Sequence, residues 1–348
     1  MQPVIDKRDI NSMLLPELEE YFKAAGEKQF RAQQLFRWLH GGARAFNDMT
    51  NLPALLRDKL DREFYITVPK LLKKQVSGID GTIKYLWGMT DGCAVESVIM
   101  EYSYGNTVCI STQVGCRMGC VFCASTIGGL TRNLNASEML AQVLHSQLES
   151  GEKITNVVLM GIGEPLDNFD NVIRFISLIN HPSGMNIGIR HISLSTCGII
   201  ENIDKLAAHD LKLTLSVSLH APDDATRSLL MPINKTTGLD KLFRACGSYF
   251  NKTGRRISYE YAMIEKVNDT LEHAGRLASI LKKSGSHLNI ILLNNVPERH
   301  LRASPPVRVN AFTGVLKREG INYTVRRRLG GDIDASCGQL RRRFEDGD

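Results

Sequence analysis

The feature that most constrains the fold is a series of short apolar segments that alternate with longer helical segments from residue 107 onward. Near-continuous apolar runs of five to eight residues are typical of strands that are buried on both faces. Helical segments such as 137–148 and 271–283 separate them. Strands joined by helices of this length pair in parallel, so the sequence predicts an α/β fold. The predicted strands are TVCIS (107–111), 154–160, 191–196, 213–219, 257–264 and 287–294.

Six such strands fit an incomplete barrel, although an open, doubly wound sheet would leave the same pattern. The chain before them has a different organisation. Residues 12–62 predict helices, with an apolar stripe that includes Leu18, Phe30 and Phe36. TIKYLW and AVESVIMEY then flank a turn at Asp91-Gly92 and predict a β-hairpin. We therefore divide the chain into a helical domain (1–65), a connecting hairpin (66–101) and an α/β core (102–348).

Unusual residues follow the predicted strands at one end. Gly161-Ile162-Gly163-Glu164-Pro165 comes directly after one strand, and Ser195, Ser218 and Asn294 lie at the ends of others. A cysteine-rich stretch follows the first strand. Ligands of parallel α/β folds lie at the carboxyl ends of the strands, so these loops predict one shared site.

The cysteine-rich stretch GCRMGCVFCAS places Cys116, Cys120 and Cys123 within eight residues. Three soft thiolates in one loop favour an iron–sulfur cluster or zinc over a hard metal ion. Zinc would need a distant fourth ligand, for which His145 or His220 would serve. Three buried thiols without a role are a further alternative.

Eight cysteines without a recognisable secretory signal indicate a reducing compartment, and we expect the protein to be cytoplasmic. No run is long and apolar enough to span a bilayer, so we expect no membrane association. The net charge of +6 permits a polyanionic partner. Solvated faces would explain any one cluster of basic residues, but several clusters are typical of a nucleic-acid surface. The clusters comprise Lys70, Lys73, Lys74, Arg326–Arg328 and Arg341–Arg343.

The cysteine spacing, with Phe122 before the last cysteine, resembles the signature of the radical S-adenosylmethionine (SAM) superfamily. The resemblance extends along nearly the whole chain to the bacterial dual-specificity RNA adenine-C2 methyltransferases. It rests on motifs that occur in the same order as in that family. These are QVGCRMGCVFCAS with GGLTRNL behind it, GIGEPLDN, LSTCG, SVSLHAP, LMPINK and GGDIDASCGQL, together with GEKQFRAQQLFRWLH in the helical domain. The fold implied is an incomplete (β/α)6 radical-SAM barrel with a small N-terminal helical domain that binds RNA.

The resemblance implies a [4Fe-4S] cluster held by Cys116, Cys120 and Cys123, with the fourth iron left open for SAM. Gly163 and Glu164 are implied to hold the methionine amino group. Further implied SAM contacts are Ser195, Ser218, Leu219, His220 and Asn294.

Two more cysteines are implied to be catalytic. Cys337 corresponds to the family cysteine that a first SAM methylates, and Cys109 to the thiol that later resolves the enzyme–RNA adduct through a transient disulfide. A second SAM is consumed in each turnover. Glu96 corresponds to the proton acceptor; pattern alone would place it on a hairpin in water.

The implied substrates are an adenosine of 23S ribosomal RNA, in the peptidyl transferase centre, and one in the tRNA anticodon loop. A flavodoxin-type protein is implied as electron donor, and we expect a monomer. Two alternatives stay open. A sister family methylates C8 of the ribosomal adenosine and confers antibiotic resistance, and Pro165 in GEPL favours the C2 family. The more distant alternative is a zinc-stabilised RNA-binding protein without catalysis.

Overall fold

The structure, a computed structural model, describes residues 7–282, 284–293 and 299–333. Its centre is a sheet in which ten strands are hydrogen-bonded in the order β14-β13-β12-β11-β10-β9-β6-β5-β4-β3. The strands are β3 (Lys70–Val76), β4 (Ile83–Gly88), β5 (Ala94–Tyr102), β6 (Gly105–Ile110), β9 (Ile154–Leu159), β10 (Ile192–Thr196), β11 (Thr214–Ser218), β12 (Ser258–Met263), β13 (His287–Leu292) and β14 (Tyr323–Val325).

All six predicted strands are present, and they pair in parallel with their neighbours in chain order, from β6 to β13. A doubly wound sheet would reverse its strand order at a switch point, and this order does not. The last described strand, β14, adds a further parallel strand that the sequence analysis did not predict. Among the described strands, β14 and β3 end the order without pairing to each other, so the barrel is incomplete, as predicted.

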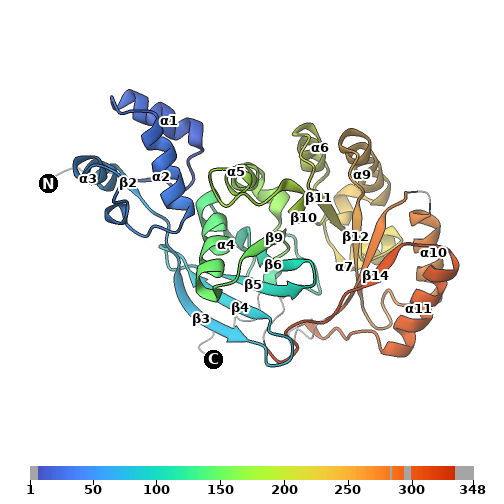
Figure 1. The fold of residues 1–348 in the computed structure, drawn as a ribbon. Helices are drawn as coiled ribbons and strands as arrows, with labels where there is room; N and C mark the ends of the chain where they lie inside the picture. The colour runs from blue at the N-terminus through green and yellow to red at the C-terminus, as the bar shows by residue number, and fades with distance from the viewer. Residues whose placement is uncertain (1–6, 283, 294–298, 334–348) are drawn as a thin grey trace.

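Helices cover the outer face of the parallel strands, as Figure 1 shows. Their inward stripes are buried against the sheet, for example Val172, Phe175 and Ile179 of α5. The helices are α4 (Ala136–Ser150), α5 (Phe169–Asn180), α6 (Ile200–Ala208), α7 (Asp224–Leu230), α8 (Asn234–Thr237), α9 (Leu239–Thr253), α10 (Leu271–Leu281) and α11 (Pro306–Arg318). Short 3-10 turns lie at Phe46–Asp48, Ala124–Thr126, Pro165–Asn168 and Ile189–His191.

The N-terminal part is helical, as predicted. It comprises α1 (Leu15–Ala24), α2 (Phe30–His40) and α3 (Ala54–Glu63), with β1 (Arg8–Asp9) paired to β2 (Phe64–Tyr65). Leu18 and Phe36 are buried as expected, but Phe30 is 46% exposed, so its prediction as a core residue was wrong. Phe30 is the first residue of α2, and the buried residues of this helix begin at Ala32.

The predicted hairpin is present as β4 and β5, which pair in antiparallel fashion. It is not an isolated connection, because β3 pairs with β4 and β5 pairs with β6, so all three strands extend the barrel sheet. In the sequence, Lys70, Lys73 and Lys74 stand out only as a cluster of basic residues. They lie on β3, and lysines on an edge strand discourage pairing with another chain. No described helix is long and apolar enough to cross a membrane.

Candidate active site

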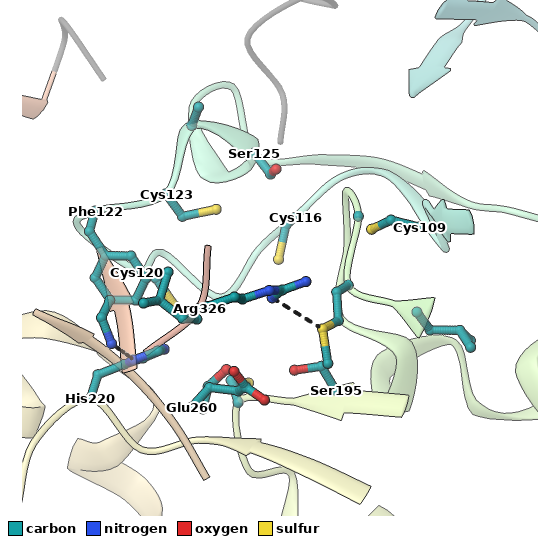
Figure 2. A pocket seen from close by; sticks show the side chains of 18 of the residues that line it. Cys109, Cys116, Cys120, Phe122, Cys123, Ser125, Ser195, His220, Glu260 and Arg326 are labelled. Carbon is teal, nitrogen blue, oxygen red and sulfur yellow. Dashed lines mark hydrogen bonds between the residues drawn. The ribbon is translucent and has the colours of Figure 1, made fainter. Parts of the chain in front are cut away.

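A cavity of about 380 Å³ lies at the carboxyl ends of the parallel strands (Figure 2). It brings together residues from segments that are far apart in the sequence, which is the shared site that the strand-end pattern predicted. Nine of the singled-out residues line it: Cys109, Cys116, Cys120, Cys123, Gly163, Glu164, Ser195, Ser218 and His220.

Four other singled-out residues are not among those that line the described cavity. The side chain of Leu219 is fully buried in the main core, so only the backbone of this residue lies near the end of β11. Glu96 is buried on β5 beyond Val98 and Met100, which do line the cavity. Asn294 and Cys337 lie outside the described residues, as do Arg341–Arg343.

The cysteine loop leaves β7 (Gln113–Gly115), which pairs with β8 (Leu130–Asn133). Gly115 has φ +79°, and a Cβ at this position would lie 2.0 Å from the carbonyl oxygen of Gly129. Only glycine fits both constraints, which explains this residue in QVGC. The Cys116 amide donates to the same Gly129 oxygen at 2.9 Å, and Thr126 Oγ1 donates to the carbonyl oxygens of Cys120 and Cys123. The loop is therefore fixed at both ends.

The loop suits an iron–sulfur cluster. Burial raises the pKa of the Cys116 thiol to about 12, and the pKa of Cys120 is raised further by the same cause. Such thiols ionise when a metal centre supplies the compensating charge. Cys120 packs with Leu230, Met231 and Ile264 in an apolar group apart from the main core, which excludes water.

No three His, Cys, Asp or Glu side chains of the described chain are arranged to hold a single metal ion. A [4Fe-4S] cluster takes one thiolate per iron, so its thiols do not need to converge on one point. Of the two histidines considered for zinc, His220 lines the cavity, whereas His145 packs near Trp87, with ring centroids 6.3 Å apart.

Glu164 is a buried carboxylate held by two backbone amides. Its Oε1 accepts from the Leu166 amide at 3.0 Å, and its Oε2 accepts from the Cys197 amide, at the end of β10, at 2.7 Å. Burial raises the pKa of Glu164. An ammonium group in the cavity would offset the cost of burying this charge, so the residue fits the amino group of SAM.

His220 is neutral and fixed in orientation. Its backbone is left-handed, with φ +56°, and its Nδ1 accepts from the Ala262 amide at 2.9 Å. Burial, with Arg227 nearby, lowers the pKa of His220 to about 3. The ring proton therefore lies on Nε2, and the ring can donate a hydrogen bond from that atom. The ring meets Phe122 edge-on, with centroids 4.8 Å apart, so it also supports the cysteine loop.

Glu96 forms a buried ion pair across the hairpin. The Nζ of Lys84, on β4, lies 3.0 Å from Glu96 Oε2, and both side chains are shielded from solvent. The glutamate is therefore not the solvated hairpin residue that pattern alone would suggest. Its backbone oxygen also accepts from Ser111 Oγ at 2.7 Å, which ties β5 to the end of β6.

Two charged residues of the cavity, Glu260 and Arg326, were not predicted from the sequence as part of the site. Glu260, on β12, accepts at Oε1 from the Asn289 side-chain amide, Nδ2, at 2.9 Å, while Oε2 is buried without a hydrogen-bond partner among the described residues. An acidic residue within a fully buried strand was the available signal. Arg326 was considered only as part of a basic cluster, and Figure 2 shows it extending across the cavity above Glu260.

Comparison with known proteins agrees with this architecture. Residues 9–66 match the model of the ribosomal RNA large subunit methyltransferase N-terminal domain, and residues 110–278 match that of the radical SAM superfamily. The chain is 50% identical over 342 residues to the probable dual-specificity RNA methyltransferase RlmN of Desulforamulus reducens, covering 98% of this chain and 97% of that one.

A second relative, the probable dual-specificity RNA methyltransferase RlmN of Geobacillus thermodenitrificans, is 50% identical, with 95% of this chain and 92% of that one covered. The crystal structure of a radical SAM methyltransferase from Sphaerobacter thermophilus superposes with a TM-score of 0.90 at 41% identity, covering 95% of this chain and 98% of that one. On this near full-length similarity, the chain belongs to the RlmN family of radical SAM dual-specificity RNA methyltransferases.

Proposed function

We propose that this enzyme methylates C2 of an adenosine in 23S ribosomal RNA, in the peptidyl transferase centre, and in the tRNA anticodon loop. The observation that supports this most directly is the position of Cys109. It lies on β6, outside the cysteine loop, yet lines the same cavity as Cys116, Cys120 and Cys123. A cluster-binding protein without catalysis has no use for a separate thiol there.

In this proposal Cys116, Cys120 and Cys123 hold the [4Fe-4S] cluster, and Glu164 and Gly163 hold the amino group of SAM. Gly163 has φ +112°, and a Cβ would lie 2.7 Å from Gln113 Cβ, so glycine is needed where this loop packs against Gln113. Ser195, Ser218, His220, the Leu219 backbone and Asn294 complete the SAM site. When bound, the cluster and SAM supply a 5′-deoxyadenosyl radical that abstracts hydrogen from a methyl group.

The protein's own residues carry the methyl group and release the product. Cys337 receives a methyl group from the first SAM, and its methylene carbon forms the new bond to C2. Glu96 accepts the C2 proton as the RNA adduct passes its unpaired electron back to the electron-transfer partner, and the Lys84 ammonium keeps this carboxylate oriented. The Cys109 thiolate then attacks the Cys337 sulfur, which forms a disulfide and breaks the bond from sulfur to the methylene carbon. That carbon leaves as the methyl group of the product once it gains a proton.

The disulfide must be reduced before the next turnover, and the chemistry needs a further electron, so we propose a flavodoxin-type donor. Because one chain supplies every residue in this scheme, we propose a monomer. Ribosomal and transfer RNA as substrates imply a cytoplasmic enzyme.

The test is mass spectrometry of nucleosides. Undermethylated ribosomal RNA and tRNA would be incubated without oxygen with reconstituted protein, a reductant and SAM that carries a trideuterated methyl group. We expect 2-methyladenosine that retains two of the three deuterons, because one is lost at the Cys337 methylene stage. 8-Methyladenosine would assign the protein to the C8 activity instead. If cluster-loaded protein produced no methyladenosine, the proposed substrate would be wrong.

A further inference from the structure

Two tyrosines stack on each other at the turn between β5 and β6. The rings of Tyr102 and Tyr104 are nearly parallel, with centroids 5.0 Å apart and an angle of 6° between their planes. Tyr104 is 66% exposed, which is unusual for a large aromatic side chain. The pair therefore presents aromatic surface to solvent on a support that is itself aromatic.

The turn that holds the tyrosines is anchored to the barrel. Gly105 has φ +123°, and a Cβ there would lie 2.3 Å from Thr155 Oγ1, so the turn packs closely against the start of β9. Thr155 Oγ1 also donates to the Asn106 carbonyl oxygen at 3.2 Å. An anchored aromatic surface loses little conformational entropy when a flat ligand binds to it.

The tyrosine pair lies at the rim of the active-site cavity beside basic residues. Tyr102 lines the cavity, and so do Arg326, Arg327 and Arg328. The guanidinium carbon of Arg327 lies 5.9 Å from the centroid of the Tyr102 ring. Burial raises the pKa of the Tyr104 phenol, and the charges of Arg326 and Arg327 oppose that rise, as expected if both lie nearby.

A single exposed tyrosine on a turn would need no explanation. Proteins bind single-stranded nucleic acids with this combination of aromatic rings and basic groups, here at the mouth of a cavity. The bases stack on the rings, and the cations contact the phosphates. Tyr104 itself does not line the described cavity, so a base on this pair would be a neighbour of the one inside.

We propose that Tyr102 and Tyr104 form a stacking platform for the nucleotide next to the target adenosine, with Arg327 on the adjoining phosphate. This inference rests on the proposed RNA substrate and adds a contact to it. Moving the adenosine into the cavity breaks its stacking with that neighbour, and the platform replaces the lost contact. Because every base has a flat face, the platform tolerates different neighbours, which suits an enzyme with two RNA substrates.

The test measures RNA binding by fluorescence anisotropy. Cluster-loaded protein would be titrated against a labelled anticodon stem-loop. Tyr104→Ala should weaken binding about tenfold to a hundredfold, the usual effect of losing one stacked base. Tyr104→Phe should bind like the parent protein, because the ring and not the hydroxyl makes the contact, and Tyr104→Leu should resemble the alanine variant.

The matched control is Phe250→Ala, which removes another exposed aromatic ring from α9, in the outer helical layer. Arg327→Gln should lower the slope of log affinity against log salt concentration by about 0.7, and Tyr104→Ala should leave that slope unchanged. The platform is refuted if Tyr104→Ala weakens binding no more than Phe250→Ala, or if the leucine variant binds like the parent.

Methylation of the same stem-loop by the parent protein separates this proposal from the proposed function. If the parent makes no methyladenosine, the proposed function fails. If the parent methylates the RNA but Tyr104→Ala binds normally, only the platform fails.

Discussion

Replacing Arg227 by lysine tests whether one buried guanidinium group holds two strand ends of the active site together. Arg227 has no exposed surface. Its Nε donates to the Leu219 carbonyl oxygen at 3.1 Å, and its Nη2 donates to those of Cys197 at 2.8 Å and Ser218 at 3.0 Å. Its Nη1 donates to Asn234 Oδ1 at 2.7 Å.

A lysine keeps the positive charge but not the planar arrangement of donors. Its three N–H bonds radiate from one atom and cannot reach acceptors placed around a guanidinium plane. If about two acceptors lose their partners, at about 1–3 kcal/mol each, Arg227→Lys should lower the free energy of unfolding by about 2–6 kcal/mol. The control is Arg276→Lys, because that side chain is solvent-exposed in an i,i+4 pair with Glu272, where substitutions cost less than about 0.5 kcal/mol.

The assay is guanidinium unfolding followed by circular dichroism, together with SAM binding to cluster-loaded protein below the transition. Because the acceptor carbonyls belong to the segments that end β10 and β11, SAM affinity should fall along with stability. If Arg227→Lys unfolds within 0.5 kcal/mol of the parent, as expected for Arg276→Lys, then the guanidinium geometry does not matter and the reasoning fails.

Three further outcomes follow from the structure. Cys109→Ala should trap the RNA covalently on the protein, seen as a band that resists denaturation on gels; its absence would exclude Cys109 as the resolving thiol. Lys84→Met should lower the free energy of unfolding by about 3–5 kcal/mol, because it leaves the buried Glu96 carboxylate without the ammonium at 3.0 Å. The double variant with Glu96→Leu should recover part of that loss. An unchanged unfolding midpoint in Lys84→Met would contradict this reasoning. Burial lowers the pKa of His40 and His145 to about 4, so the unfolded chain binds protons at these residues that the folded chain does not. As pH drops from 6.5 towards 4, these two histidines together should contribute up to about 3 kcal/mol per pH unit to the fall in stability. Asparagine at both positions should reduce that slope, and an equal slope would refute the assignment.

The sequence predicted the features that depend on local pattern. The apolar strands, the cysteine spacing and the loop GIGEP were visible as short motifs, and the parallel pairing of the strands followed from the helices between them. β3 was not predicted, because its side chains do not alternate clearly between buried and exposed. It is an edge strand, where lysine is common. Phe30 was wrongly placed in the core because periodicity does not tell where a helix begins.

Contacts between distant segments could not be predicted. Arg227 occurs in a short helical segment and has the appearance of a surface residue, and only the fold brings the carbonyl oxygens of Cys197 and Ser218 to it. Lys84 and Glu96 are on different strands of the hairpin, and their pairing depends on the antiparallel register. Cys337 and Asn294 lie outside the described residues, so their roles stay predictions.

Hydrogen bonds from buried side chains connect the strand ends in sheet order. Gln113 Oε1, after β6, accepts from the Glu164 amide, after β9, at 2.8 Å. Glu164 in turn accepts from the Cys197 amide, after β10, and Arg227 joins Cys197 to the end of β11. His220, after β11, accepts from an amide of β12. Each loop of the site is therefore fixed by the loop beside it.

This arrangement affects how variants of the site should be interpreted. Glu164 and His220 line the cavity and also belong to the hydrogen-bonded series, so replacing either would disturb the proposed SAM contacts and the loop positions together. Arg227 belongs to the series but is not among the described residues that line the cavity. A loss of SAM affinity in Arg227→Lys would therefore measure loop positioning alone. If Glu164→Gln lowers SAM affinity more than Arg227→Lys does, only the difference can be assigned to the proposed contact between the Glu164 carboxylate and the ammonium group of SAM.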